Sequence, residues 1–298
     1  MTTERIDKQW QERGLSAYST GAILGTLTHY GVSIDSISFR AQAELFYPLT
    51  IAQSWLELWK GTGKFAKLPA PAVEELWRRL APDLLQPLDV IDALTQVMTA
   101  LIALRKREAA PPVAEKFDAL DAVLKRVPDA GERRDHFIAE VVMVLSGSIE
   151  TLDLMAEGLA REGHTEYADR FVAVEETLFP VRKGVSAALV LAAKGDREKA
   201  LTALRTIADD SGRDEYARVS GVDALIHLKA AEHAIAPLTQ LADKANEAND
   251  GEILGELDPR WHAVADAAPA GPAREKAIAE LRKSHQRMER FGGHGHHH

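Results

Sequence analysis

The sequence predicts an all-α protein, a helix-pair α-solenoid that follows an aromatic-rich helical N-terminal domain. Alanine and leucine recur throughout the 298 residues, whereas β-branched and aromatic residues become sparse after the first quarter. That composition favours helix over strand. No segment alternates apolar and polar residues with the period of two that a half-buried strand requires. Two similar segments, which begin at residues 184 and 221, predict that the later helices repeat.

Apolar residues at helical spacing predict five helices before residue 110, at 16–30, 35–47, 49–60, 71–81 and 87–108. Pro71 and Pro87 are expected in first turns, where proline costs no hydrogen bond. Ten further helices are predicted at 112–126, 131–145, 147–162, 165–178, 181–194, 196–209, 213–228, 231–247, 258–266 and 272–291.

Aromatic content and charge both change near residue 110. Ten of the 18 aromatic residues lie between Trp10 and Trp77. Residues 1–110 carry 12 Lys+Arg and 12 Asp+Glu, whereas residues 111–298 carry 24 and 33, which accounts for the whole net charge of −9. The segment REAAPPVAE places a double proline at the same point, where it interrupts a helix. We therefore predict a helical N-terminal domain at 1–110, a helical-repeat domain at 111–291 and a disordered His/Gly tail at 292–298.

The repeat prediction depends on two pairs of similar segments. GVSAALVLAA at residue 184 matches GVDALIHLKA at residue 221, and the helices that follow match at Leu204 with Leu238 and Ile207 with Leu241. The offset is 37 residues for the first pair and 34 for the second, so the difference falls in the connecting loop, as expected for a repeat with a variable turn.

These residues resemble the HEAT-repeat family of stacked helix pairs. The resemblance covers about 184–245 and is carried by Ala217, Arg218, Gly221, Ala224, Leu225, Leu228 and Pro237. The stretch from Ala193 to Leu201 instead resembles the turn of a tetratricopeptide repeat. HEAT repeats are about 40–47 residues long and tetratricopeptide repeats about 34, so the repeat subtype stays open.

Composition excludes several classes of function. The chain has no cysteine, which excludes disulfides, thiolate catalysis and cysteine-ligated zinc. The N-terminus is too charged for a secretory signal, and the apolar stretch at 184–193 is too short for a membrane span of about 17–25 residues. Neither part has the basic excess that nucleic-acid binding requires. We therefore expect a cytoplasmic protein with no membrane span and no nucleic-acid partner.

Two patterns suggest chemistry but have simpler structural interpretations. WKGTGKF at residues 59–65 resembles a phosphate-binding loop, but Leu58 and Phe65 occupy positions that need glycine and a hydroxyl. We predict instead a helix end with Gly61 in the left-handed conformation. The acidic pairs are expected at solvated helix surfaces and caps; they are Glu175 with Glu176, Asp209 with Asp210, and Glu166 with Asp169. No catalytic or cofactor-binding residue is predicted.

The C-terminal sequence FGGHGHHH gathers His294, His296, His297 and His298. Neutral imidazoles bind Ni²⁺, Zn²⁺ and Cu²⁺, so these residues are the predicted metal ligands. A purification remnant is the alternative interpretation of this tail. His227 and His233 are six residues apart, which does not suit a helical metal pair, and a turn is expected between them.

Three functional hypotheses follow. The first is a non-enzymatic protein–protein interaction or scaffold protein, whose acidic repeat surface favours a partner with a basic face. The second is a transition-metal-handling protein that uses the C-terminal histidines. The third is an enzyme whose small-molecule pocket lies among Trp55, Trp59, His29 and Tyr30.

Overall fold

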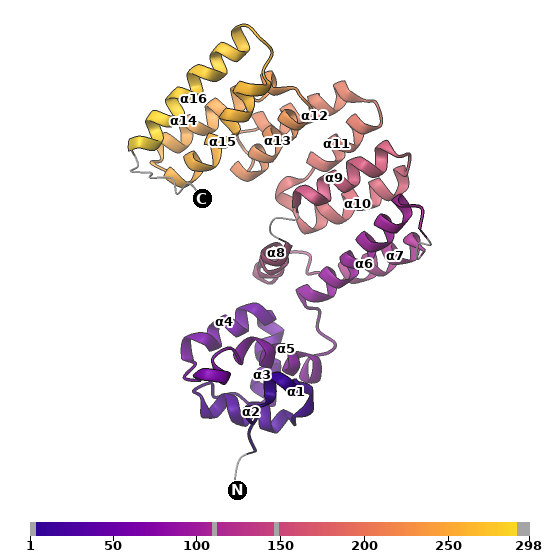
Figure 1. Cartoon of the computed structure of the whole chain (residues 1–298), viewed down its shortest axis with the longest axis vertical. Helices are drawn as coiled ribbons and strands as arrows, with labels where there is room; N and C mark the ends of the chain where they lie inside the picture. The colour runs from indigo at the N-terminus through magenta and orange to yellow at the C-terminus, as the bar shows by residue number, and fades with distance from the viewer. Residues whose placement is uncertain (1–3, 109–111, 146–148, 291–298) are drawn as a thin grey trace. The chain divides into compact units, whose positions relative to one another are not determined.

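The computed structural model describes residues 4–108, 112–145 and 149–290. Within these ranges the regular elements are sixteen α-helices and four short 3₁₀ helices, and no strand occurs (Figure 1). The all-α prediction is therefore confirmed. The chain divides into two compact units, Met1–Ser146 and Gly147–His298, which we name unit 1 and unit 2.

This division differs from the boundary predicted near residue 110. The double proline lies inside unit 1, between α6 and α7, and these two helices pack on each other. Unit 2 carries 19 Lys+Arg and 26 Asp+Glu, so most of the negative charge lies in it.

The helices of unit 1 begin where the sequence supplies an N-cap or an early proline. Ser19 Oγ accepts a hydrogen bond from Ala22 N (3.0 Å), and Asp35 caps the next helix in the same way. Pro71 and Pro87 lie in first turns, as predicted. The helices are α1 (Trp10–Arg13), α2 (Thr20–His29), α3 (Ser36–Leu45), α4 (Pro48–Leu58), α5 (Pro69–Leu80), α6 (Pro87–Arg105), α7 (Val113–Leu124) and α8 (Glu132–Leu145), with 3₁₀ turns η1 (Leu15–Ala17) and η2 (Gly63–Phe65).

Large aromatic side chains fill the core of unit 1. Trp55, Trp77, Tyr47 and Phe39 are all buried. The ring of Tyr47 packs on those of Trp77 and Phe137, with centroids 6.5 and 5.1 Å apart. Because each ring removes a large apolar area from water, these side chains contribute strongly to the stability of a small helical unit.

Helix α6 is long and apolar enough to cross a membrane, judged by length and composition alone. The sequence predicts a helix at 87–108, but it is the apolar stretch at 184–193 that is assessed as a membrane span. One face of α6 is buried through Val90, Leu94, Val97 and Leu101, and the helix packs on α7 and α8. A soluble core helix has the same features, so the absence of a membrane span stays a prediction.

Unit 2 contains eight described α-helices and two 3₁₀ turns. They are α9 (Ile149–Arg161), α10 (Thr165–Leu178), η3 (Pro180–Arg182), α11 (Val185–Ala193), α12 (Arg197–Asp209), α13 (Glu215–His227), η4 (Ala231–His233), α14 (Ile235–Glu247), α15 (Gly251–Ala267) and α16 (Pro272–Arg290). The largest difference from prediction is at α15, which begins seven residues early because Asp250 accepts hydrogen bonds from Glu252 N and Ile253 N.

The same turn ends α9, α11 and α13. Each helix is followed by one residue with positive φ, which is Gly163, Gly195 and Lys229 in turn. The next backbone N–H then returns to a carbonyl in the last turn, which is the Schellman arrangement. These hydrogen bonds run from His164 N to Leu159 O (2.8 Å), from Asp196 N to Leu191 O (3.0 Å) and from Ala230 N to Leu225 O (2.9 Å). The positive-φ positions are 32 and 34 residues apart.

Each helix of unit 2 packs on its successor, and α9, α11, α13 and α15 also contact one another in that order. The core formed by α11 to α16 contains several of the residues that carry the repeat prediction, with Leu204, Leu225 and Leu238 at 0% exposure. A Cβ on Gly221 would lie 3.2 Å from Ala208 N, so this glycine allows α13 to approach α12 closely. Gly184, its predicted counterpart, instead precedes α11 with φ 93°.

Candidate functional site

The predicted metal ligands His294, His296, His297 and His298 lie outside the described residues. His227 ends α13 and His233 ends η4, so a turn does separate them, as predicted.

The aromatic residues proposed for an enzyme pocket form two groups in unit 1. The ring of Tyr30 contacts His29 and Trp59, with centroids 4.8 and 5.2 Å apart. Trp55 instead packs against Phe39 at 6.0 Å and is buried. These contacts are typical of aromatic core packing.

The loop at residues 59–65 differs from its prediction. Helix α4 ends at Leu58 and its C-cap Trp59 is extended, so the prediction of a left-handed Gly61 cap is wrong. Gly63 has the positive φ, at 58°. A Cβ on Gly61 would lie 2.5 Å from Trp59 Nε1, so glycine is needed there to let the indole ring pass.

The acidic pairs have different environments. Asp209 and Asp210 are exposed, and Asp169 forms an exposed ion pair with Lys194, as expected of solvated helix surfaces. Glu175 is buried instead, where it accepts hydrogen bonds from Ser186 Oγ and Arg182. The solvated interpretation is therefore wrong for Glu175, because its helix turns this position toward α11 and η3.

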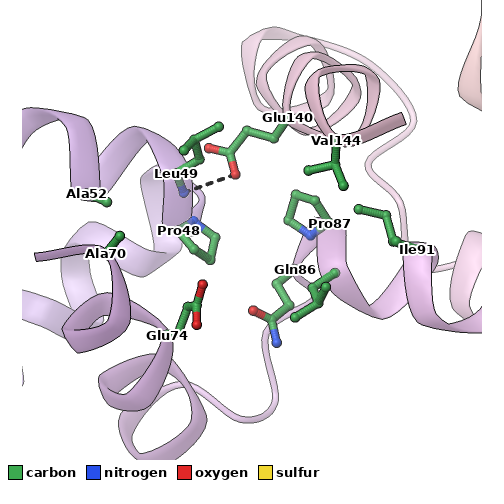
Figure 2. A pocket seen from close by; sticks show the side chains of 11 residues that line it. Pro48, Leu49, Ala52, Ala70, Glu74, Gln86, Pro87, Ile91, Glu140 and Val144 are labelled. Atoms are coloured by element: carbon green, nitrogen blue, oxygen red, sulfur yellow. Dashed lines mark hydrogen bonds between the residues drawn. The ribbon is translucent and has the colours of Figure 1, made fainter. Parts of the chain in front are cut away.

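Unit 1 contains an apolar pocket between α4, α5, α6 and α8 (Figure 2). Its volume of about 170 Å³ is below the range of about 300–1,000 Å³ for small-molecule sites. Glu140 lies at its edge but accepts hydrogen bonds from Leu49 N (3.2 Å) and from Thr50 N and Oγ1 (2.8 Å each). This carboxylate therefore caps the N-terminus of α4, and both of its oxygens are used in hydrogen bonds to that helix.

Unit 2 has a longer recess on the face formed by α9, α11 and α13. Two adjoining hollows of about 250 and 230 Å³ share His227, and we name them together the groove. It is lined by Leu154, Glu157, Arg161, Arg182, Val185, Leu189, Ala192, Arg197, Ser220, Asp223, Ala224, His227, Leu228 and Lys229. Most of these residues come from α9, α11 and α13, whereas Arg182 belongs to η3 and Arg197 to α12.

Apolar side chains form part of the groove. Val185, Leu189 and Ala224 are buried beneath it, whereas Leu154 on α9 is 54% exposed at its edge. An exposed leucine beside a recess can cover apolar groups of a bound chain.

Glu157 and His227 connect α9 to α13 within the groove. Glu157 is buried, with Oε2 2.7 Å from His227 Nε2, and its other oxygen accepts from Arg161. A buried carboxylate is stable only with such partners. The pair is separated by 70 residues in sequence, so no local pattern could have predicted it.

Cations gather near the ends of α9 and α13. Arg161 is the last residue of α9, Lys229 follows α13, and Arg197 donates to Leu228 O (2.6 Å). Cations at helix C-termini are stabilised by the helix dipole. Among the described residues, no carboxylate lies within 4 Å of the cationic groups of Arg197 or Lys229. Their charge is therefore available to a ligand.

Asp223, the second acidic residue of the groove, is neutralised within unit 2. Arg260 of α15 donates to both of its carboxylate oxygens, at 2.8 and 2.9 Å. Burial alone would lower the pKa of Arg260, but hydrogen bonds and attraction from Asp223 and Glu256 outweigh that effect and raise the pKa. The groove therefore presents four basic side chains and two carboxylates. Both carboxylates have a basic partner, and two of the basic side chains are themselves paired, Arg161 with Glu157 and Arg182 with Glu175.

A separate cluster of metal-binding side chains lies on α15 and α16. Asp258 and His262 are one turn apart on α15, and His285 approaches them from α16. His262 Nε2 lies 3.3 Å from His285 Nε2. The only local sign of this cluster in the sequence is the spacing of four residues between Asp258 and His262 on a predicted helix. The third member, His285, is 23 residues further along the chain from His262.

Comparison with known proteins gives no relative: no protein-family model, no curated protein and no solved structure matches this chain.

Proposed function

We propose that this protein is a non-enzymatic scaffold whose unit 2 is an α-solenoid that binds a partner chain in the groove. The observation that carries the proposal is the groove itself, because one recess runs across three successive odd-numbered helices. A surface of this kind suits an extended or helical segment of another protein.

The repeated turns support the solenoid. The positive-φ residues after α9, α11 and α13 are 32 and 34 residues apart. That period equals the roughly 34 residues of a tetratricopeptide unit and is shorter than the roughly 40–47 of HEAT and armadillo units. We therefore favour tetratricopeptide-like helix pairs, which are α9 with α10, α11 with α12 and α13 with α14. In this arrangement the groove lies mainly on the first helix of each pair.

The charges of the groove favour an acidic partner segment. Arg197 and Lys229 line it with no carboxylate within ion-pair distance among the described residues. The other charged side chains of the groove are paired: Arg161 with Glu157, Arg182 with the buried Glu175, and Asp223 with Arg260. Aspartate or glutamate side chains of a bound segment would complement the free charges, and an apolar side chain would cover Leu154.

A partner with a basic face remains the second candidate, favoured by the net charge of −7 that unit 2 carries. Such a partner would dock on exposed carboxylates such as Asp209 and Asp210, away from the groove. The first candidate depends on the basic side chains of the groove and the second on exposed carboxylates outside it. Substitution of each set of charges therefore distinguishes the two candidates.

We expect a labelled peptide of alternating glutamate and leucine to bind the full chain, and its lysine counterpart to bind at least about tenfold more weakly. Fluorescence anisotropy over a salt series measures both affinities. Binding of the acidic peptide should weaken as salt rises, because free charges are screened beyond about 8 Å at physiological ionic strength. Arg197→Gln with Lys229→Asn should weaken it about tenfold, and asparagine tolerates the positive φ at position 229.

Lys276→Asn with Arg282→Gln is the matched control, because it removes two exposed charges from α16. This control should leave the affinity within about twofold. If the lysine peptide binds better, or if Asp209→Lys with Asp210→Lys has the larger effect, the acidic-partner proposal fails and the basic-face candidate takes its place.

A further inference from the structure

We infer that Asp258, His262 and His285 form a binding site for Zn²⁺ or a similar divalent transition metal on the surface of unit 2. Two neutral imidazoles and one carboxylate are a ligand set that zinc uses in proteins. This site is separate from the C-terminal histidines and is built from side chains whose positions the structure describes.

The distances between the ligand atoms match one tetrahedral ion. Atoms that bind zinc at about 2.0–2.1 Å in tetrahedral geometry lie roughly 3.3 Å from one another. His262 Nε2 is 3.3 Å from His285 Nε2, which is 3.5 Å from Asp258 Oδ1. His262 Nε2 is 3.9 Å from Asp258 Oδ2. Small rotations of exposed side chains bring all three atoms to bonding distance.

Ordinary pairing explains this arrangement less well. The two contacts between aspartate and histidine, at 3.5 and 3.9 Å, are longer than good hydrogen bonds, which are about 2.7–3.2 Å. The two imidazole nitrogens form one hydrogen bond with each other, which is also long at 3.3 Å, with ring centroids 5.3 Å apart. Three donor atoms that converge without bonding well to one another are what a shared cation requires.

The helices hold the site in place. Asp258 and His262 share one face of α15 because residues four apart align along a helix. Ser284 of α16 is buried, and its Oγ donates to Asp258 Oδ1 at 2.8 Å. A hydrogen bond of this kind orients a ligating carboxylate. The side chains of His262 and His285 are 54% and 50% exposed, so an ion can enter from solvent and keep an open fourth position.

The test uses the full chain with the four C-terminal histidines replaced, His294→Asn, His296→Asn, His297→Asn and His298→Asn. Calorimetric titration with zinc chloride should show one ion bound per chain. In this background His262→Asn or His285→Asn should each lower the affinity at least about 100-fold, and Ser284→Ala about tenfold. His233→Asn, which changes a histidine of η4, should leave the affinity unchanged.

Cobalt supplies a readout of coordination geometry, which the zinc titration does not give. Co²⁺ in the tail-substituted chain should give the intense visible absorption of a tetrahedral ion, and His262→Asn should abolish it. Circular dichroism in the presence of a chelator should be the same for every variant, because the histidines are half exposed. If the tail-substituted chain binds no zinc, or if both histidine replacements leave its affinity unchanged, the site does not exist and any metal is held elsewhere.

Discussion

Replacing Leu225 with aspartate is expected to destabilise unit 2 by at least about 4 kcal/mol. Leu225 is fully buried in the core that joins α12, α13 and α14. The substitution removes apolar contacts and places a carboxylate among the apolar side chains of that core. Because domains are stable by only about 5–15 kcal/mol, thermal or urea unfolding followed by circular dichroism should show a large loss.

Tyr216→Asp is the matched control, since Tyr216 lies on the same helix and is 58% exposed. Its substitution should change the unfolding free energy by no more than about 0.5 kcal/mol. An unchanged melting temperature for Leu225→Asp would mean that α13 does not pack as described.

The second large effect is expected at Glu175, where lysine should cost about 3–5 kcal/mol. The side chain is buried and accepts hydrogen bonds from Ser186 and Arg182, so a lysine there would bury a cation beside the positive charge of Arg182. Glu175→Gln should cost less, because the amide oxygen can still accept one of these hydrogen bonds.

Asp210→Lys makes the same change of charge at an exposed position of the same unit. It should alter the unfolding free energy by less than about 1 kcal/mol. Equal effects of the two lysine substitutions in urea unfolding would show that Glu175 is solvated after all.

The helices of this chain were predictable because their signals are local. Apolar spacing and early prolines predict fifteen of the sixteen described α-helices, with the largest difference in bounds at the start of α15. Leu204, Leu225 and Leu238, which the repeat pattern singles out, are buried in the core of unit 2. Only the four-residue helix α1 was missed. A single turn carries too few apolar positions to show a period.

Features that depend on packing between helices were not predictable. Gly184 and Gly221 look equivalent in sequence, but Gly184 precedes α11 whereas Gly221 lies within α13, where it packs on α12. Within a single loop, the sequence predicts a cap at Gly61, whereas the glycine is needed there to accommodate the indole ring of Trp59. Glu175 and Glu176 are adjacent acidic residues, and the sequence does not show which of the two side chains faces the interior. The structure buries Glu175.

The candidate sites were missed for the same reason. Glu157 and His227 meet across 70 residues, and His285 joins Asp258 and His262 only because α16 packs on α15. Net charge alone predicts a partner with a basic face, because unit 2 is acidic as a whole. Its groove, however, is lined by more cations than carboxylates. Local charge follows from which side chains face a recess, and the sum over the chain does not contain that information.

Photo-crosslinking in the native source tests the scaffold proposal most directly. A photoreactive phenylalanine analogue replaces Leu154 at the edge of the groove, and a second protein carries it at Ile278 on α16, which is also exposed. The crosslinked partner peptide is then sequenced. We predict that position 154 captures a segment rich in aspartate and glutamate, that position 278 does not, and that Arg197→Gln with Lys229→Asn abolishes the product. Capture of the same segment from both positions, or of a basic segment at position 154, would contradict the account.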